Sequence, residues 1–336
     1  MKIEKILLDH GSGGKLAHQL TTDLLLPLFN NPLLAPLHDG AVFDVAGGRL
    51  AFSTDSFVVD PIFFPGGDIG DLAVNGTVND LAMCGAVPRY LSLALILEEG
   101  LPVADLKRIL ASIRNALDRA GVQLITGDTK VVQRGAADKL FINTAGIGLV
   151  PPGVVIGGDG ARPGDCILLS GTMADHGIAV LTQREGLRFQ SEVVSDTAPL
   201  AAMVQAILAA APGVRVLRDP TRGGVGTVLN EIALQSKVGV VIDEALLPVR
   251  PAVAGICDLL GFDPLYLANE GKLLCCVPAD QAAAALAAMR REPYGREAVV
   301  IGQVVAEHPG RVVMRTCIGG RRIVDMLSGE QLPRIC

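Results

Sequence analysis

The order of the apolar segments is the feature that most constrains the fold. Short apolar runs alternate with longer helical patterns on both sides of Pro151-Pro152-Gly153, which is the best candidate for a domain boundary. A length of 336 residues suits about two domains of ~150 residues each. Aromatic residues make up only 4% of the chain, so Ala, Val, Leu and Ile must build the core. We therefore expect an α+β protein with domains over residues 1–153 and 154–327, and a tail over 328–336.

The spacing of apolar residues places the individual elements. In the first half it predicts helices over 16–28, 69–84 and 102–120, and strands over 50–53, 89–97, 122–126 and 140–150. In the second half it predicts helices over 175–185, 199–210, 223–236, 251–260 and 280–291, and strands over 166–170, 214–217, 238–242, 273–277, 299–304 and 311–315. The tail has no core pattern, so we expect it to be mobile when no nucleotide is bound.

Charge and cysteine usage exclude several classes of protein. The net charge of −6, with scattered basic residues, argues against a nucleic-acid partner. The amino terminus does not resemble a signal peptide, and the longest charge-free runs contain Pro and Gly, so no membrane span is expected. The seven cysteines form no Cys-x-x-Cys pair, which argues against a disulfide framework and a zinc site. We expect a cytoplasmic protein in which all cysteines before the last are small buried hydrophobes.

The last residue, Cys336, is the strongest candidate for a reactive group. It ends an extended segment that begins at Pro333, and Pro disfavours a helix at the residue before it. A thiol on a mobile arm can react at one site and be delivered to another. From the tail alone, this interpretation and that of an unpaired surface cysteine both remain open.

Glycine and acidic residues indicate an anion and metal site. The loop over 9–15 (Asp-His-Gly-Ser-Gly-Gly-Lys) lies between an apolar segment and a helix, where backbone N–H groups favour phosphate. It lacks the spacing of a Walker A loop, and a structural turn is an equal alternative. Asp9, Asp55, Asp80 and Asp128 end strands or lie in a polar helix stripe, and several such carboxylates can share Mg²⁺ with a nucleotide. Each one singly also suits a cap or a turn.

Two further turns lie in the second half. Residues 218–224 form a Gly-rich, basic turn that suits an anion and precedes a helix. Glu270, in the run Ala-Asn-Glu-Gly-Lys over 268–272, is either a catalytic base or a turn carboxylate.

Together these motifs resemble the HypE family of hydrogenase maturation factors. The family belongs to the ATP-binding superfamily of aminoimidazole ribonucleotide synthetase and selenophosphate synthetase. The superfamily relatives share the Asp and Gly motifs but lack the cysteine tail. The matching segments are His10–Gly14, Phe52–Phe57, Phe63–Gly70, Gly127–Val132, Thr221–Gly224, Ala268–Lys272 and Pro333–Cys336.

The resemblance implies a fold and a ligand set. The fold would be PurM-like, with the N-terminal sheets of two copies pairing into a barrel across a homodimer. ATP would lie near that interface, with Mg²⁺ held by Asp55, Asp80 and Asp128. The residues implied to bind the nucleotide also include Asp9, Gly11, Ser12, Gly13, Gly14, Asn79 and Thr129.

The resemblance also implies a carbamoyl dehydratase. A HypF-like carbamoyltransferase would place a carboxamide on the thiol of Cys336. ATP-dependent dehydration would then give a thiocyanate, with Glu270 as the base and Lys130 positioning the carboxamide. A HypC–HypD-like iron scaffold would accept the cyanide for a [NiFe]-hydrogenase.

Two other classes of function remain as alternatives. A selenophosphate synthetase typically carries a reactive Cys or Sec near its amino terminus, whereas the first cysteine here is Cys84. A non-catalytic carrier would only ferry a group that is made elsewhere.

Overall fold

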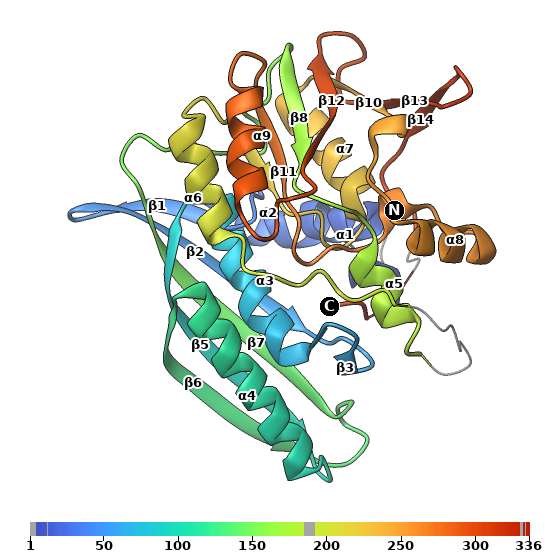
Figure 1. The fold of residues 1–336 in the computed structure, drawn as a ribbon. Coiled ribbons are helices and arrows are strands. Elements are labelled where there is room, and N and C mark those ends of the chain that lie inside the picture. Colours follow the sequence, from blue (N-terminus) through green and yellow to red (C-terminus); the bar gives the residue numbers. More distant parts are fainter. Residues whose placement is uncertain (1–4, 12, 185–191, 330–331, 333) are drawn as a thin grey trace.

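The computed structural model describes residues 5–11, 13–184, 192–329, 332 and 334–336. Figure 1 shows two sheets with helices packed against them, the first in the lower half of the view and the second in the upper half. The two-domain α+β architecture expected from the sequence is confirmed.

The first sheet has five strands and is covered by helices on one face. Its pairs are antiparallel except for β5 with β6, which run parallel. Helix α4 (Val103–Ala120) makes the crossover between those two strands and ends at Gly121, whose φ of 67° is left-handed. The strand order is β1 (Ala41–Val45), β2 (Gly48–Phe57), β7 (Leu140–Val150), β5 (Val87–Glu98) and β6 (Gln123–Val132).

Helix α3 (Ile69–Met83) lies between the two domains. It contacts β2 and β7 on one side and α6 (Ala201–Ala210) on the other. Almost every residue of α3 is buried, and its polar face of Asp71, Asn75 and Asn79 is hydrogen-bonded within the protein. Its amino terminus is capped by Asp68, which accepts hydrogen bonds from the N–H groups of Gly70 and Asp71. The helix thus carries Asp80 to the junction of the domains.

The second sheet has seven strands and is buried on both faces. Leu168 packs with α6 and α9 (Ala282–Arg291), whereas Ile167 and Leu169 pack with α7 (Gly224–Ser236). Double coverage explains why these strands appear as continuous apolar runs. The strand order is β14 (Arg321–Val324), β13 (Val312–Arg315), β10 (Gly239–Asp243), β12 (Val299–Val305), β8 (Asp165–Leu169), β11 (Leu274–Pro278) and β9 (Val216–Arg218).

The shorter elements connect these layers. The predicted helix over 16–28 is a continuous helical stretch with a π-helical segment in its middle. The elements are η1 (Leu8–Gly11), α1 (Lys15–Leu20), η2 (Thr21–Leu25), α2 (Leu26–Phe29), β3 (Phe63–Phe64), β4 (Gly67–Asp68), α5 (Asp175–Leu181), η3 (Glu244–Leu246), α8 (Pro251–Leu260) and η4 (Pro264–Tyr266).

Several expectations from the sequence are wrong. Strands β2 and β6 continue through residues that we expected in turns, because their exposed polar positions still pair with neighbouring strands. Edge strands β1 and β14 were not predicted, since each pairs on one side only and carries charged residues. Cys317 is exposed rather than buried.

The tail contributes apolar residues to the core, although its sequence shows no core pattern, and its mobility without nucleotide stays a prediction. Leu332 and Ile335 are 8% and 5% exposed and belong to a core cluster shared with both domains.

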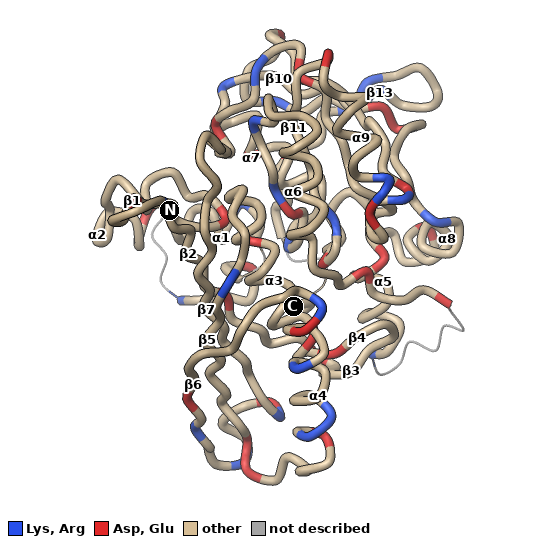
Figure 2. The backbone as a smooth tube through the Cα atoms, turned by 60° about the vertical axis from the view of Figure 1, so that its left-hand side comes forward, with Lys and Arg blue, Asp and Glu red and all other residues tan. Residues whose placement is uncertain are grey.

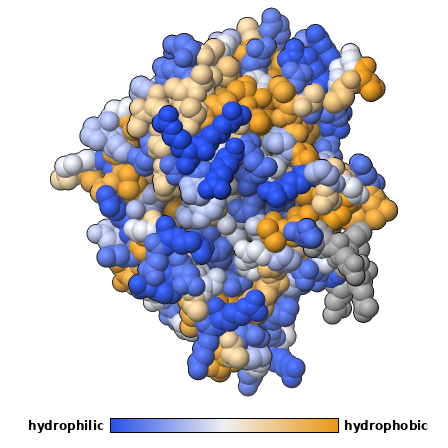
Figure 3. Space-filling model, in the orientation of Figure 1, coloured by the Kyte–Doolittle hydropathy of each residue, from blue (hydrophilic) through white to orange (hydrophobic). Residues whose placement is uncertain are grey.

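In the described chain no helix is long and apolar enough to cross a membrane. Figure 3 shows mostly hydrophilic atoms on the side viewed, with an apolar patch at α8, where Leu259 is exposed.

Candidate active site

A cavity of about 260 Å³ lies at the junction of the two domains. Figures 1 and 2 place the carboxyl terminus beside α3, where the domains meet. Strand β2 and helix α3 bring acidic residues to this cavity, and the segment after β9 brings acidic and basic ones. The charged and reactive residues that line it are Asp39, Asp55, Asp80, Arg218, Asp219, Arg222, Glu231, Glu270 and Cys336.

The tail inserts into the junction and carries Cys336 to the cavity. The backbone N–H of Val58 donates to an oxygen of the terminal carboxylate of Cys336 at 3.0 Å, and that of Asp60 donates to the backbone carbonyl oxygen of Arg334 at 3.2 Å. The Arg334 side chain pairs with Asp138 and also donates to the Val58 carbonyl oxygen. The tail therefore runs beside the segment that follows β2, and the Arg334 side chain helps to hold it there.

The carboxyl groups around the cavity are electrostatically crowded. Burial raises the pKa of Asp39 to about 6 and that of Asp219 to about 8, although Arg218 opposes both shifts. Burial also raises the pKa of Asp55, and it raises those of Asp80 and Glu270 well above their usual range. Repulsion between neighbouring carboxylates adds to the effect. A bound cation or a positively charged ligand would relieve this crowding.

The hydrogen bonds of Ser53 agree with the raised pKa of Asp80 in the absence of a bound cation. Ser53 Oγ lies 2.6 Å from Asp80 Oδ2 and 2.9 Å from the carbonyl oxygen of Asp39. One hydroxyl proton cannot serve both acceptors. When Asp80 is protonated, its hydroxyl donates to Ser53 and Ser53 donates to Asp39, so all three groups are satisfied.

Two arginines supply the positive charge. Arg218 forms ion pairs with Asp39 at 2.8 Å and with Glu231 at 2.6 Å. Arg222 lies exposed at the mouth of the cavity, and Cys336 is the main cause of its raised pKa. Arg222 therefore interacts electrostatically with the terminal residue.

The glycine-rich loop is packed against the second domain. Gly11 accepts a hydrogen bond of 2.8 Å from Arg222 through its carbonyl oxygen. A Cβ on Gly13, whose φ is +78°, would lie only 2.7 Å from the Cβ of Arg222. Gly13 also lines the cavity, whereas Gly11, Gly14 and Asp9 do not. Ser12 lies outside the described residues.

Asn79 lies behind the cavity and ties together segments that are distant in sequence. Its amide nitrogen donates to the carbonyl oxygens of Ala198 and Glu270, and its oxygen accepts from the Leu200 N–H. These contacts use its donors and its acceptor. Asn79 thus supports the segment that carries Glu270. It does not line the cavity, although we expected it among the nucleotide-binding residues.

Asp128, Thr129 and Lys130 are not brought to the cavity within one chain. They lie exposed on β6, the edge strand of the first sheet, where Lys130 pairs with Asp128 at 2.6 Å. Ser56 lines the cavity and lies in the same row of paired residues as Asp128, but β7 and β5 lie between their strands. At the usual strand spacing, the two residues are about 14 Å apart. The single chain therefore separates residues that the sequence motifs grouped together.

The residues present fit a divalent cation only together with a second source of oxygen ligands. Within the described residues, no group of three or more His, Cys, Asp and Glu side chains is placed to hold a metal ion. Asp55 and Asp80 supply two carboxyl groups, and Mg²⁺ is commonly held by one or two carboxylates plus substrate phosphates.

The sequence reasoning missed several lining residues. Asp39, Arg218, Asp219 and Glu231 were not chosen, although the basic turn over 218–224 had been noted as suitable for an anion. Asp39 precedes a strand that was not predicted. Glu231 lies on the cavity side of α7, which spacing alone did not distinguish.

Two family models match the chain along most of its length. The model "AIR synthase related protein, N-terminal domain" matches residues 37–150, and its C-terminal counterpart matches residues 162–315. The fold and the cavity between these two units thus define a protein of the AIR synthase class.

The individual relatives narrow the class. Carbamoyl dehydratase HypE of Cupriavidus necator is 56% identical over 337 residues, covering 100% of this chain and 96% of the relative. A solved HypE in complex with ATP has a TM-score of 0.84 and 54% identity, with 99% and 100% coverage. A HypE–HypF complex has a TM-score of 0.87 and 45% identity, with 92% and 99% coverage. The chain belongs to the HypE family of carbamoyl dehydratases.

Proposed function

We propose that this protein dehydrates an S-carboxamide on its own Cys336 to a thiocyanate at the expense of ATP, and so supplies cyanide for the iron of a [NiFe]-hydrogenase. The observation that carries the proposal is the position of Cys336. The thiol-bearing residue lines the same cavity as Asp55, Asp80 and Glu270. An accidental surface cysteine has no reason to lie among buried carboxyl groups at a domain junction.

The chemistry requires an amide oxygen to become a leaving group. The carboxamide oxygen attacks the γ-phosphorus of ATP, ADP leaves, and loss of one N–H proton gives an imidate phosphate. Removal of the remaining N–H proton then expels phosphate and forms the C≡N bond. The balance is carboxamide plus ATP giving thiocyanate, ADP, phosphate and one proton. Phosphoryl transfer of this kind depends mainly on positioning and charge stabilisation.

Glu270 is the proposed base for the N–H proton. It is 4% exposed, and its Oε1 has no hydrogen-bond partner within the described residues. A raised pKa makes a carboxylate a stronger proton acceptor once it is ionised, and nearby cations promote that ionisation. The cations that we propose for this effect are Arg222, at the cavity mouth, and Lys130, which would also position the carboxamide.

Asp55 and Asp80 are the proposed cavity ligands of Mg²⁺, with Asp128 completing the set. The ion would offset the charge of the ATP phosphates. Gly11, Ser12, Gly13 and Gly14, with Asp9 before them, are proposed to close over the nucleotide. Asn79 and Thr129 complete the nucleotide set, Asn79 by supporting the cavity wall from behind.

A homodimer would resolve the distance between Asp128 and the cavity. The face of the first sheet opposite α3 exposes apolar residues, among them Phe52 at 43% and Leu149 at 48%. Paired residues of neighbouring strands point to the same face of a sheet. Asp128 and Lys130 therefore share that face with their partners on β5, Ala94 and Ile96. We propose that two such sheets pair into a barrel, and that β6 of each copy contributes to the cavity of the other.

The partners follow from the same proposal. A HypF-like carbamoyltransferase would modify Cys336 when the tail turns outward, and a HypC–HypD-like iron scaffold would receive the cyanide. We propose a cytoplasmic location. The proposed units are an ATP-binding and dimerisation domain over 1–153, a second domain over 154–327 and a reactive tail over 328–336.

The test is to follow the carboxamide itself. The protein would be carbamoylated by its transferase and given Mg-ATP, and the C-terminal peptide would be followed by mass spectrometry. We expect Cys336 to lose one water only when ATP is present, with the C≡N stretch appearing in the infrared spectrum. An unchanged carboxamide in a dimeric protein that has bound ATP would refute the proposal in favour of a carrier.

A further inference from the structure

His176 contacts the tail immediately before the reactive cysteine. It is fully buried on α5, and its Nε2 lies 2.8 Å from the carbonyl oxygen of Ile335. Its Nδ1 lies 2.8 Å from Ser195 Oγ. The edge of its ring packs against Phe64, with centroids 5.4 Å apart. No role has been assigned to this histidine in the chemistry described above.

The hydrogen bonds fix the tautomer of His176. A carbonyl oxygen only accepts, so Nε2 must carry the proton that is donated to Ile335. Nδ1 then accepts from the hydroxyl of Ser195, and Ser195 Oγ accepts in turn from the Thr197 N–H at 3.2 Å. A neutral imidazole satisfies the whole chain of hydrogen bonds, in agreement with the lowered pKa that burial gives His176.

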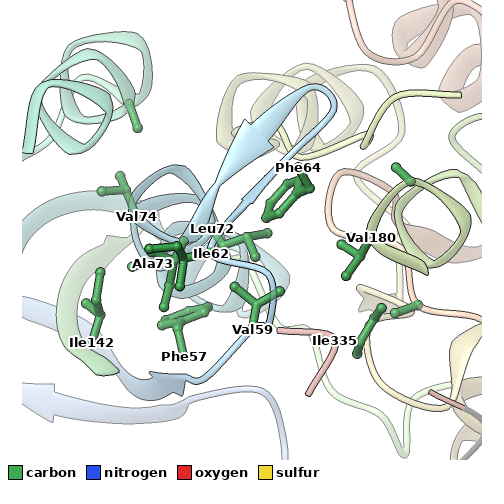
Figure 4. Close-up of a cluster of buried hydrophobic side chains, with 14 of the residues drawn as sticks. Phe57, Val59, Ile62, Phe64, Leu72, Ala73, Val74, Ile142, Val180 and Ile335 are labelled. Carbon is green, nitrogen blue, oxygen red and sulfur yellow. The ribbon is translucent and has the colours of Figure 1, made fainter. Parts of the chain in front are cut away.

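Holding the Ile335 carbonyl restricts where the sulfur of Cys336 can lie. The carbonyl belongs to the rigid peptide unit that ends at the Cys336 nitrogen. On the other side of that residue, the Val58 N–H donates to an oxygen of the Cys336 terminal carboxylate at 3.0 Å. With both flanking groups fixed, the main freedom left to the sulfur is χ1, which has three staggered wells. Figure 4 shows the Ile335 side chain in the buried cluster near Val59 and Val180.

The same hydrogen-bond chain reaches the segment that holds the proposed base. Ser195 and Thr197 flank Asp196, whose Oδ1 accepts from the backbone N–H of Glu270 at 3.0 Å. His176 therefore joins the peptide unit next to the reactive thiol to the segment that anchors Glu270.

We propose that His176 is a positioning residue, which captures the Ile335 carbonyl when the tail turns inward and so sets the thiol-bound carboxamide against the cavity. It is not a catalytic residue, because it touches neither the thiol nor a reacting group. The inference deepens the proposed function and rests on it for its catalytic meaning. The capture of the tail itself depends only on the contacts of His176.

A matched pair of variants separates the two ring nitrogens. His176→Gln places an amide nitrogen near the position of Nε2 and retains a donor for Ile335. His176→Asn reaches only the position of Nδ1 and leaves the buried carbonyl without a donor. The two variants are similar in polarity and differ in the one hydrogen bond of interest.

The first measurement needs neither ATP nor a carboxamide. The unmodified protein would be treated with iodoacetamide, and alkylation of Cys336 would be followed in the peptide over residues 331–336, released by cleavage after Glu330. We expect alkylation about tenfold faster in His176→Asn, and within about threefold of the native rate in His176→Gln. Exposed Cys317 in the same molecules is the internal control and should react at an unchanged rate.

The second measurement is single-turnover dehydration of the carbamoylated protein. We expect about a tenfold slower reaction in His176→Asn and substantial rescue in His176→Gln, with ATP affinity unchanged and carbamoylation of Cys336 no slower than in the native protein. A purely structural role would instead lower the melting temperature of both variants and slow all of these steps together.

The outcomes are decisive in both directions. Equal alkylation of Cys336 in the native protein and in His176→Asn would overturn the proposal. If the His176 variants do not fold, Ser195→Ala should still speed alkylation by about threefold, and no change there would overturn it. If alkylation follows the expected order but no dehydration occurs even in the native protein, the proposed function fails and tail capture by His176 stands.

Discussion

Acidic and basic residues lie both in the cavity at the domain junction and on the exposed edge strand β6, but the pKa values of their aspartates are shifted in opposite directions. In the cavity, burial raises the pKa of Asp219 to about 8 and also raises the pKa of Asp55. On β6, a hydrogen bond from Lys130 lowers the pKa of Asp128, which is fully exposed. The cavity is crowded with carboxyl groups that a cation would stabilise, whereas the edge already holds a satisfied ion pair.

This difference shows that similar residue types in the motifs are not enough to place them together in one chain. Asp55 lies on β2 and Asp128 on β6 of the same sheet, so β7 and β5 separate the two strands. Four predictions test this contrast.

The largest effect should come from the proposed base in the cavity. Glu270→Gln should slow dehydration by about 10²–10⁴-fold, because the amide cannot accept the N–H proton. ATP binding should remain, which equilibrium nucleotide binding would check. Glu307→Gln, on an exposed loop beyond the second sheet, is the matched control. Equal rates in the two variants would remove Glu270 from the mechanism.

The comparison becomes sharper when a cavity variant and an edge variant are mixed. Asp80→Asn and Lys130→Gln should each lower dehydration by about 10²–10³-fold. If β6 serves the cavity of the second copy, each mixed dimer contains one intact site. Random exchange should then restore about a quarter of native activity. Activity that stays at the level of the single variants would show that the two residues act within one chain.

The apolar face of the first sheet gives the third prediction. Phe52→Asp places a charge on the face that we propose is covered by a second copy, and should weaken self-association by about 30-fold. Sedimentation equilibrium measures this directly. Leu246→Asp, at a similarly exposed apolar position in the second domain, should leave self-association unchanged. Loss of association in neither variant would argue against the barrel.

The smallest effect concerns stability and pH. The folded pKa of Asp219, about 8, lies above its unfolded value of 3.8, so its contribution is fully present below that value and is lost as the pH rises through 8. Asp219→Asn should therefore match the native protein near pH 4 and melt a few degrees higher above pH 8, at about 2–4 °C per kcal/mol. The comparison is made without nucleotide or Mg²⁺.

A buried aspartate with the opposite shift provides the control for that experiment. Burial raises the pKa of Asp196, but Lys272 at 3.0 Å, His176 and the Glu270 N–H together lower it further than burial raises it. Asp196→Asn should destabilise the protein at neutral pH, and the difference should shrink as the pH falls through the folded pKa. The same direction of change in both variants would contradict the assigned shifts.

The two-domain α+β class, most of the helices and strands and the family could be predicted from the amino-acid sequence. Apolar spacing located α3, α4 and the doubly covered strands β8 and β11, because a packed core requires those patterns wherever the element lies. The motifs around Asp55, Glu270 and Cys336 identified the HypE resemblance.

Which of these residues meet could not be predicted and is seen in the folded chain alone. The tertiary structure brought Asp39, Arg218 and Glu231 to the cavity and placed Asn79 behind it. It also showed that Ile335 packs in the core and that His176 binds its carbonyl. Local patterns record the environment of one element, whereas contacts between residues 159 positions apart depend on how the domains close on each other. For that reason no spacing in the sequence pointed to His176.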